Sequence, residues 1–176
     1  MTPHPFLALL TESLNLIHPR FAAAHGREYT PEEADEPPAT RKFKERSFLM
    51  ECYAEFRRLW DRAEPVRRGL GHVVIQGDPD SPARQPDLLF WKLGEHGEPD
   101  RRLAAVSLVF ATNPAALAAD LKLLARFRDL GYALAVCVIV GREADPAPPA
   151  ADGVVVLRFD AEKWKVISPD SPRGVP

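Results

Sequence analysis

The chain has 176 residues, 45% of them hydrophobic and 27% charged, which is the balance of one folded domain with a sizeable core. Its 23 basic and 25 acidic residues give a formal net charge of -2 at pH 7. This balance excludes a polycation that binds nucleic acid over its whole surface, so any such contact needs a local basic patch. The sequence shows no apolar run long enough to span a membrane and no charged-then-apolar leader, so we expect a soluble, cytoplasmic protein with no membrane partner.

The first 40 residues are predicted to form a helix followed by an acidic, proline-rich loop. The helix covers residues 6–17 and ends near His18 and Pro19, because proline cannot continue a helix. We interpret the loop as a solvated surface segment; the alternative is a phosphate mimic that faces a basic partner. Its acidic residues are Glu28, Glu32, Glu33, Asp35 and Glu36.

The strongest helical pattern covers residues 41–61, where apolar side chains recur at helical spacing. Residues 41–68 contain nine basic and five acidic side chains, a local excess of four positive charges. Such an excess favours contact with the phosphates of DNA or RNA, for which Arg57, Arg58 and Arg62 are the candidate residues. A solvated helix face is the alternative.

The rest of the chain predicts an α/β fold, a mixed central sheet flanked by helices. The central strand is residues 103–112, LAAVSLVFAT, because an almost unbroken apolar run is typical of a strand covered on both faces. A helix over residues 115–130 leads into an apolar strand, which favours a parallel crossover. Residues 41–167 form one predicted domain and residues 168–176 a loose tail. The other predicted strands are residues 72–77, 86–93, 132–141 and 153–160, with a short continuation at 162–167.

The order of these elements resembles the core of the PD-(D/E)XK nuclease superfamily. The resemblance covers residues 41–160: a helix, a strand that opens with Pro86-Asp87, a hairpin, the central strand, a crossover helix and a further strand. It implies a restriction-endonuclease-like fold in which an Asp and a Glu on neighbouring strands hold magnesium or manganese. A Lys two residues past that Glu positions the attacking water, and a Glu on the preceding helix often completes the site.

Matched position by position, Glu51 corresponds to the helix acid and Asp87 to the metal-binding Asp. The Glu and Lys positions hold Ser107 and Val109. A serine hydroxyl is a poor magnesium ligand without several carboxylates beside it, and valine cannot orient or activate water. The sequence therefore predicts a catalytically degenerate member, in which Asp87 is at best a weak metal ligand and Ser107 and Val109 are vestigial positions.

Relocation of the missing groups is the alternative, and Asp120 is the best substitute acid because it falls on the inward face of the predicted crossover helix. No lysine is well placed to replace the missing one, since Lys122 points away from the core and Lys92 lies on the opposite sheet face.

Three functions stay open. The first is a non-catalytic module that binds nucleic acid or a protein partner. The second is an active nuclease that uses Asp87, Asp120 and Glu51, for which alone magnesium or manganese would be the cofactor. The third is a structural protein, such as a homodimer, that keeps only the fold.

Other catalytic patterns are missing from the sequence. The five histidines show no metal-ligand spacing, and there is no phosphate-binding Gly-rich loop and no G-x-S-x-G turn. Cys52 and Cys137 lie far apart in apolar segments, so we expect two buried free thiols rather than a disulfide or a metal site.

Overall fold

The computed structural model describes residues 4–19, 45–63, 73–75, 85–94, 97, 99–111, 114–142 and 151–170; within these ranges the side chains of 45–47, 73–75 and 168–170 are left aside. The predicted acidic loop and most of the basic residues of the 41–68 segment lie outside the described residues. No helix in the described ranges is long and apolar enough to cross a membrane.

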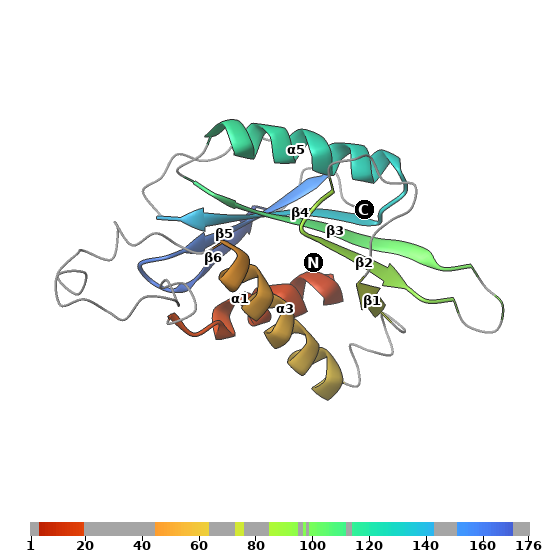
Figure 1. Ribbon diagram of the computed structural model, residues 1–176, viewed down its shortest axis with the longest axis horizontal. Coiled ribbons are helices and arrows are strands. Elements are labelled where there is room, and N and C mark those ends of the chain that lie inside the picture. Colours follow the sequence, from red (N-terminus) through yellow and green to blue (C-terminus); the bar gives the residue numbers. More distant parts are fainter. Residues whose placement is uncertain are drawn as a thin grey trace.

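The molecule has three layers, with one sheet between helix α5 on one face and helices α1 and α3 on the other (Figure 1). This arrangement confirms the predicted α/β class with a mixed sheet flanked by helices. The helices are α1 (Pro5–Leu16), α3 (Glu45–Arg62) and α5 (Pro114–Asp129), and the strands are β1 (Val73–Ile75), β2 (Leu88–Lys92), β3 (Arg101–Phe110), β4 (Leu134–Gly141), β5 (Val154–Asp160) and β6 (Lys165–Asp170).

The six strands in the described part of the chain follow one another in the sheet in their sequence order. Strands β1, β2 and β3 form an antiparallel meander, β3, β4 and β5 are parallel, and β6 returns antiparallel to β5. Helix α5 therefore connects two adjacent parallel strands, as the sequence predicted for the crossover. It ends just before Gly131, whose φ of 93° suits a helix C-terminus where a side chain would be strained.

Strand β3 is buried on both faces, which explains its apolar sequence. Val106 and Leu108 belong to the core under α1 and α3, whereas Ala105 and Val109 belong to the core under α5. Since successive side chains of a strand point to opposite faces, Ser107 faces α5 together with Ala105 and Val109. This alternation fixes the layer in which every candidate residue on β3 must act.

Helix α1 shares its core with the sheet and α3. Phe6 packs against Phe56 of α3 and Phe90 of β2, with ring centroids 5.4 and 4.8 Å apart. Leu10 and Leu14 are completely buried beside them. The helix predicted within residues 1–40 is thus part of the same packed unit as the segment predicted as the domain.

Strand β6 corrects the predicted tail, because Ser168, Pro169 and Asp170 pair with β5 instead of ending in a loose segment. Proline is tolerated there because β6 pairs with β5 on one side only among the described strands, so a missing N–H costs no ladder bond on the other side. Asn15 protects the outer edge by accepting a hydrogen bond from the Val166 amide at 2.7 Å. This end of α1 thereby limits pairing of β6 with another chain.

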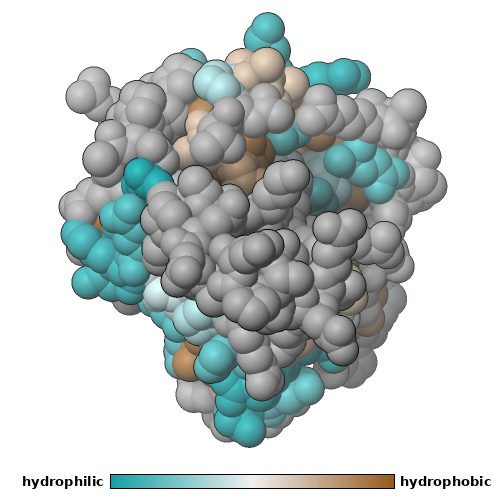
Figure 2. Space-filling view, turned by 60° about the vertical axis from the view of Figure 1, so that its left-hand side comes forward, coloured by the Kyte–Doolittle hydropathy of each residue, from teal (hydrophilic) through white to brown (hydrophobic). Residues whose placement is uncertain are grey.

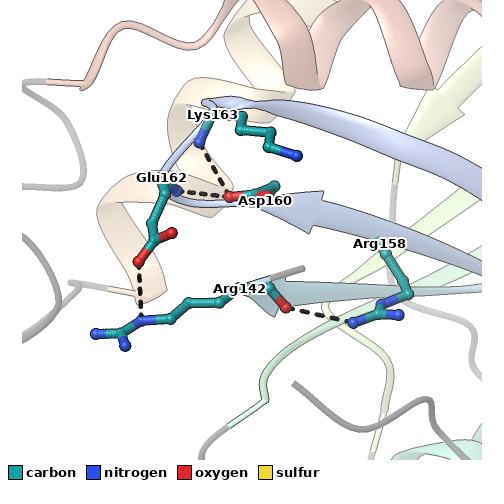
Figure 3. Close-up of polar contacts among 5 residues, drawn as sticks. All are labelled: Arg142, Arg158, Asp160, Glu162 and Lys163. Atoms are coloured by element: carbon teal, nitrogen blue, oxygen red, sulfur yellow. Dashed lines mark hydrogen bonds and ion pairs between the residues drawn. The ribbon is translucent and has the colours of Figure 1, made fainter. Parts of the chain in front are cut away.

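The turn between β5 and β6 is held by a buried carboxylate. Asp160 is 1% exposed and accepts hydrogen bonds from the amides of Glu162 and Lys163 at 2.8 and 3.0 Å (Figure 3). On the surface beside it, Arg142 contacts Glu162 at 3.3 Å, and Arg158 donates to the Arg142 carbonyl. Asp160 therefore has a structural task that accounts for its burial.

Protonation of His4 should destabilise α1. The Phe6 amide donates to His4 Nδ1 at 3.2 Å, and burial lowers the pKa of His4 from its ordinary 6.5. Because the pKa of His4 is lower in the folded chain, the unfolded chain binds the proton more readily. The stability that the His4 cap contributes is therefore complete above pH 6.5 and is lost as the pH falls toward the lowered folded-state pKa. Urea unfolding between about pH 7 and pH 5 should show a steeper loss for the parent than for His4→Asn, since asparagine caps a helix without titrating in this range. Equal pH dependence of the two proteins would contradict this role.

Candidate functional site

Asp87 stands directly before β2, opposite Ser107 of the central strand. The ladder pairs Leu88 with Val106, so the antiparallel register places Asp87 across from Ser107. The Leu108 amide donates a hydrogen bond to Asp87 Oδ2 at 2.6 Å, and this contact joins the start of β2 to the second half of β3. The sequence predicted that Asp87 and Ser107 lie on adjacent strands, and the register places them so.

Ser107 and Cys137 are direct neighbours on the parallel strands β3 and β4. Ser107 is 1% exposed and Cys137 is fully buried, because α5 and its apolar side chains cover this face of the sheet. Val109 lies one step further along β3 and is also buried, paired with Ile139. Neither Ser107 nor Val109 is open to a substrate from the α5 side.

Asp120 of α5 acts on Cys137 from the helix that covers this face of the sheet. The pKa of the Cys137 thiol is raised to about 12, mainly by burial and in smaller part by the negative charges of Asp120 and Asp87. Both carboxylates therefore act on one thiol at the same face of the sheet. The structure brings together Asp87, Ser107 and Asp120, with Cys137 as a fourth member that the sequence did not suggest.

Glu51 lies in a different layer. Its helix α3 packs through Phe48, Cys52, Phe56 and Trp60 against the opposite face of the sheet. This corrects the expectation, implied by the resemblance, that Glu51 completes a site with Asp87 and Ser107. The physical reason is the alternation of β3, which directs Ser107 toward α5 and away from the helix that precedes the sheet.

The residues present do not fit the magnesium or manganese site that the resemblance implies. These cations take about six oxygen ligands, and the group supplies two carboxylates of which one already accepts a main-chain hydrogen bond. A protonated thiol is no ligand for a hard cation. Within the described part of the chain, no set of three or more His, Cys, Asp or Glu side chains is placed to hold a metal ion. The lysine position is filled by buried Val109, while Lys122 is exposed on the far side of α5, as predicted.

The candidate nucleic-acid residues lie on the second half of α3. Arg58 and Arg62 are exposed and Arg57 is partly buried; Arg58 donates from Nε to Glu55 at 2.7 Å. Residues 48–62 contain these three arginines and three acidic residues, so their charges cancel; the acidic residues are Glu51, Glu55 and Asp61. The local excess of four positive charges in the 41–68 segment therefore comes from residues whose side chains the structure leaves undescribed.

Among the residues that are coloured in Figure 2, hydrophilic ones cover more of the area than hydrophobic ones. The large hydrophobic residues exposed in the described part of the chain are Leu16 and Met50.

The chain was compared with protein-family models, with curated proteins and with solved structures, and none of the three comparisons gave a match.

Both cysteines should resist modification in the folded protein. Burial raises the pKa of Cys52 to about 12, as burial and two carboxylates do for Cys137, so almost no thiolate forms near neutral pH. Labelling with a chromogenic disulfide at about pH 8 should be slow in native buffer and rapid for two thiols in denaturant. Rapid labelling of Cys137 in the native protein would show that α5 does not cover it.

Proposed function

We propose that this chain is a PD-(D/E)XK nuclease-like domain without divalent-metal catalysis that binds nucleic acid. The order of its elements supports the proposal: a helix, an antiparallel meander that includes the Pro86-Asp87 strand, a crossover helix and a parallel strand. The observation that carries the non-catalytic part is the state of the three matched positions. Ser107 and Val109 are buried beneath α5, and the Asp87 carboxylate accepts the amide of Leu108.

The binding part of the proposal depends on the basic segment around α3. Phosphate contacts need cations that are exposed and not all committed to neighbouring acids. Arg62 and Arg58 are exposed, and the pair of Arg58 with Glu55 is a surface pair that contributes at most about 1 kcal/mol, so a phosphate can compete for it.

An active nuclease with relocated residues is the second candidate, and one observation favours it. Asp120 and Asp87 both raise the pKa of Cys137, so the charges of both carboxylates act at this thiol beneath α5. Cleavage of DNA or RNA that requires magnesium or manganese and is lost in both Asp87→Ala and Asp120→Ala would establish this candidate. Absence of cleavage over a range of metal concentrations supports the non-catalytic proposal.

Charge reversal on α3 tests the binding surface. The triple change of Arg57, Arg58 and Arg62 to Glu should abolish binding of a labelled duplex at moderate salt. In the parent, log K against log salt should slope by about -0.9 for each phosphate contact. The matched control reverses Arg101, Lys122 and Arg126, three exposed cations outside α3.

Fluorescence anisotropy with duplex DNA, single-stranded DNA and RNA gives the readout for both triple variants. Equal loss in the control would mean that only net charge matters. Retained binding in the α3 variant would show that nucleic acid does not bind through these three arginines. Absence of binding by the parent would favour a protein partner or a structural role.

Restoring the missing catalytic pair should destabilise the protein in a metal-dependent way. Ser107→Glu with Val109→Lys buries two charges under α5, and the free energy of unfolding in EDTA should fall by at least about 3 kcal/mol. Magnesium should recover part of this loss, because Asp87 and Asp120 lie on the same side and a metal bound to the native state stabilises it.

The matched control is Val106→Glu with Leu108→Lys, two buried positions that face α1 and α3. It should lose stability without any response to magnesium. The single change Ser107→Glu keeps the test available where the double variant fails to fold. Recovery in both double variants, or in neither, would argue that Ser107 and Val109 do not line a former metal site.

A further inference from the structure

Asp87 makes a main-chain contact at the point where the β2–β3 pairing ends. The ladder runs from Lys92 with Arg101 to Leu88 with Val106, while β3 continues to Phe110. The Leu108 amide lies beyond the last pair on the β2 side and donates to Asp87 Oδ2 at 2.6 Å. The side chain thus takes the place of a strand partner that β2 no longer supplies.

Burial makes this contact necessary. Leu108 is 2% exposed, so its amide has little access to water. A buried main-chain donor without an acceptor destabilises a fold, and a carboxylate is a stronger acceptor than a neutral group. Asp87 itself is exposed, so its charge keeps contact with solvent while one oxygen reaches the strand.

The register of β3 determines which of its side chains face α5 and which face α1 and α3. A shift of one residue would turn Ser107 and Val109 toward α1 and α3 and would bring Val106 and Leu108 under α5. The hydrogen bond joins residues 21 positions apart and fixes which residue of β3 stands at the end of β2.

We infer that Asp87 is a positioning residue that ends the β2–β3 pairing and holds the register of the central strand, a role that needs no metal ion. The mismatch between the donor set and a magnesium or manganese site leads to the same assignment. An acid at the position that matches a metal ligand is accounted for by the main-chain bond that it makes. The inference goes beyond the proposed function and does not require that the chain bind nucleic acid.

Substitutions in the full-length chain, unfolded by heat in EDTA, test the inference. Asp87→Ala leaves the Leu108 amide without its acceptor and should lower the unfolding temperature by about 4 to 8 °C. Asp87→Asn keeps an oxygen acceptor and should lose less than half as much. Asp152→Asn is the matched control, because it removes one negative charge from an exposed aspartate that lies outside the β2–β3 ladder, and its unfolding temperature should change by less than about 2 °C.

Hydrogen exchange at the Leu108 amide separates positioning from a general loss of stability. In Asp87→Ala this amide should exchange faster than those of Val136 and Val138 on the neighbouring strand, whereas in Asp87→Asn it should stay protected. An unchanged unfolding temperature for Asp87→Ala, or an unchanged exchange rate at Leu108, would overturn the inference. So would an equal loss for the Ala and Asn variants combined with a magnesium-dependent rise in the parent alone, since that pattern identifies a metal ligand.

Nucleic-acid binding by the same variants keeps the inference apart from the proposed function. Unchanged unfolding of Asp87→Ala in a protein that binds nucleic acid contradicts the positioning role alone. A destabilised Asp87→Ala variant of a parent that binds no nucleic acid supports the positioning role and contradicts the proposed function.

Discussion

The burial of strand β3 on both faces constrains the rest of the structure. Seven consecutive residues from Leu103 to Val109 are buried, with Ser107 the one polar side chain among them. One face packs under α5 and the other under α1 and α3, so any charge on this stretch would lose its water without a partner. The charged side chains of the meander stand instead at strand ends, as Asp87 does before β2 and as Arg101 and Arg102 do at the start of β3.

This constraint explains why the candidate site has carboxylates but little catalytic machinery. Asp87 is exposed and Asp120 is half-buried on α5. The paired strand residues on this face of the sheet are Ser107 and Cys137, a serine and a thiol. A metal-dependent nuclease needs a carboxylate and a lysine held on the strand itself, and their burial would be compensated only by metal and substrate. Small and apolar side chains at Ser107 and Val109 avoid that cost and strengthen the core.

Much of the fold could be predicted from the sequence because its signals are local. The apolar run of β3, the helical periodicity of α5 and the glycine after it give element type and order, and the Asp87–Ser107 adjacency follows from a short hairpin. The layer of Glu51 could not be predicted, since helix periodicity does not say which face of a sheet the helix covers. Residues 168–170 include a proline and were predicted to belong to a loose tail. Their pairing could not be predicted, because an edge strand depends on a partner distant in the sequence, here β5. The approach of Asp120 to Cys137 depends likewise on packing between elements.

If Asp87 serves the main chain and not a metal ion, manganese should find no complete set of ligands beside it. Calorimetric titration of the 176-residue protein with manganese, alongside Asp87→Asn, tests this claim, because manganese takes the same oxygen ligands as magnesium. We expect no saturable one-to-one binding and no difference between the two proteins. Stoichiometric binding by the parent that disappears in Asp87→Asn would contradict the claim and would make Asp87 a metal ligand.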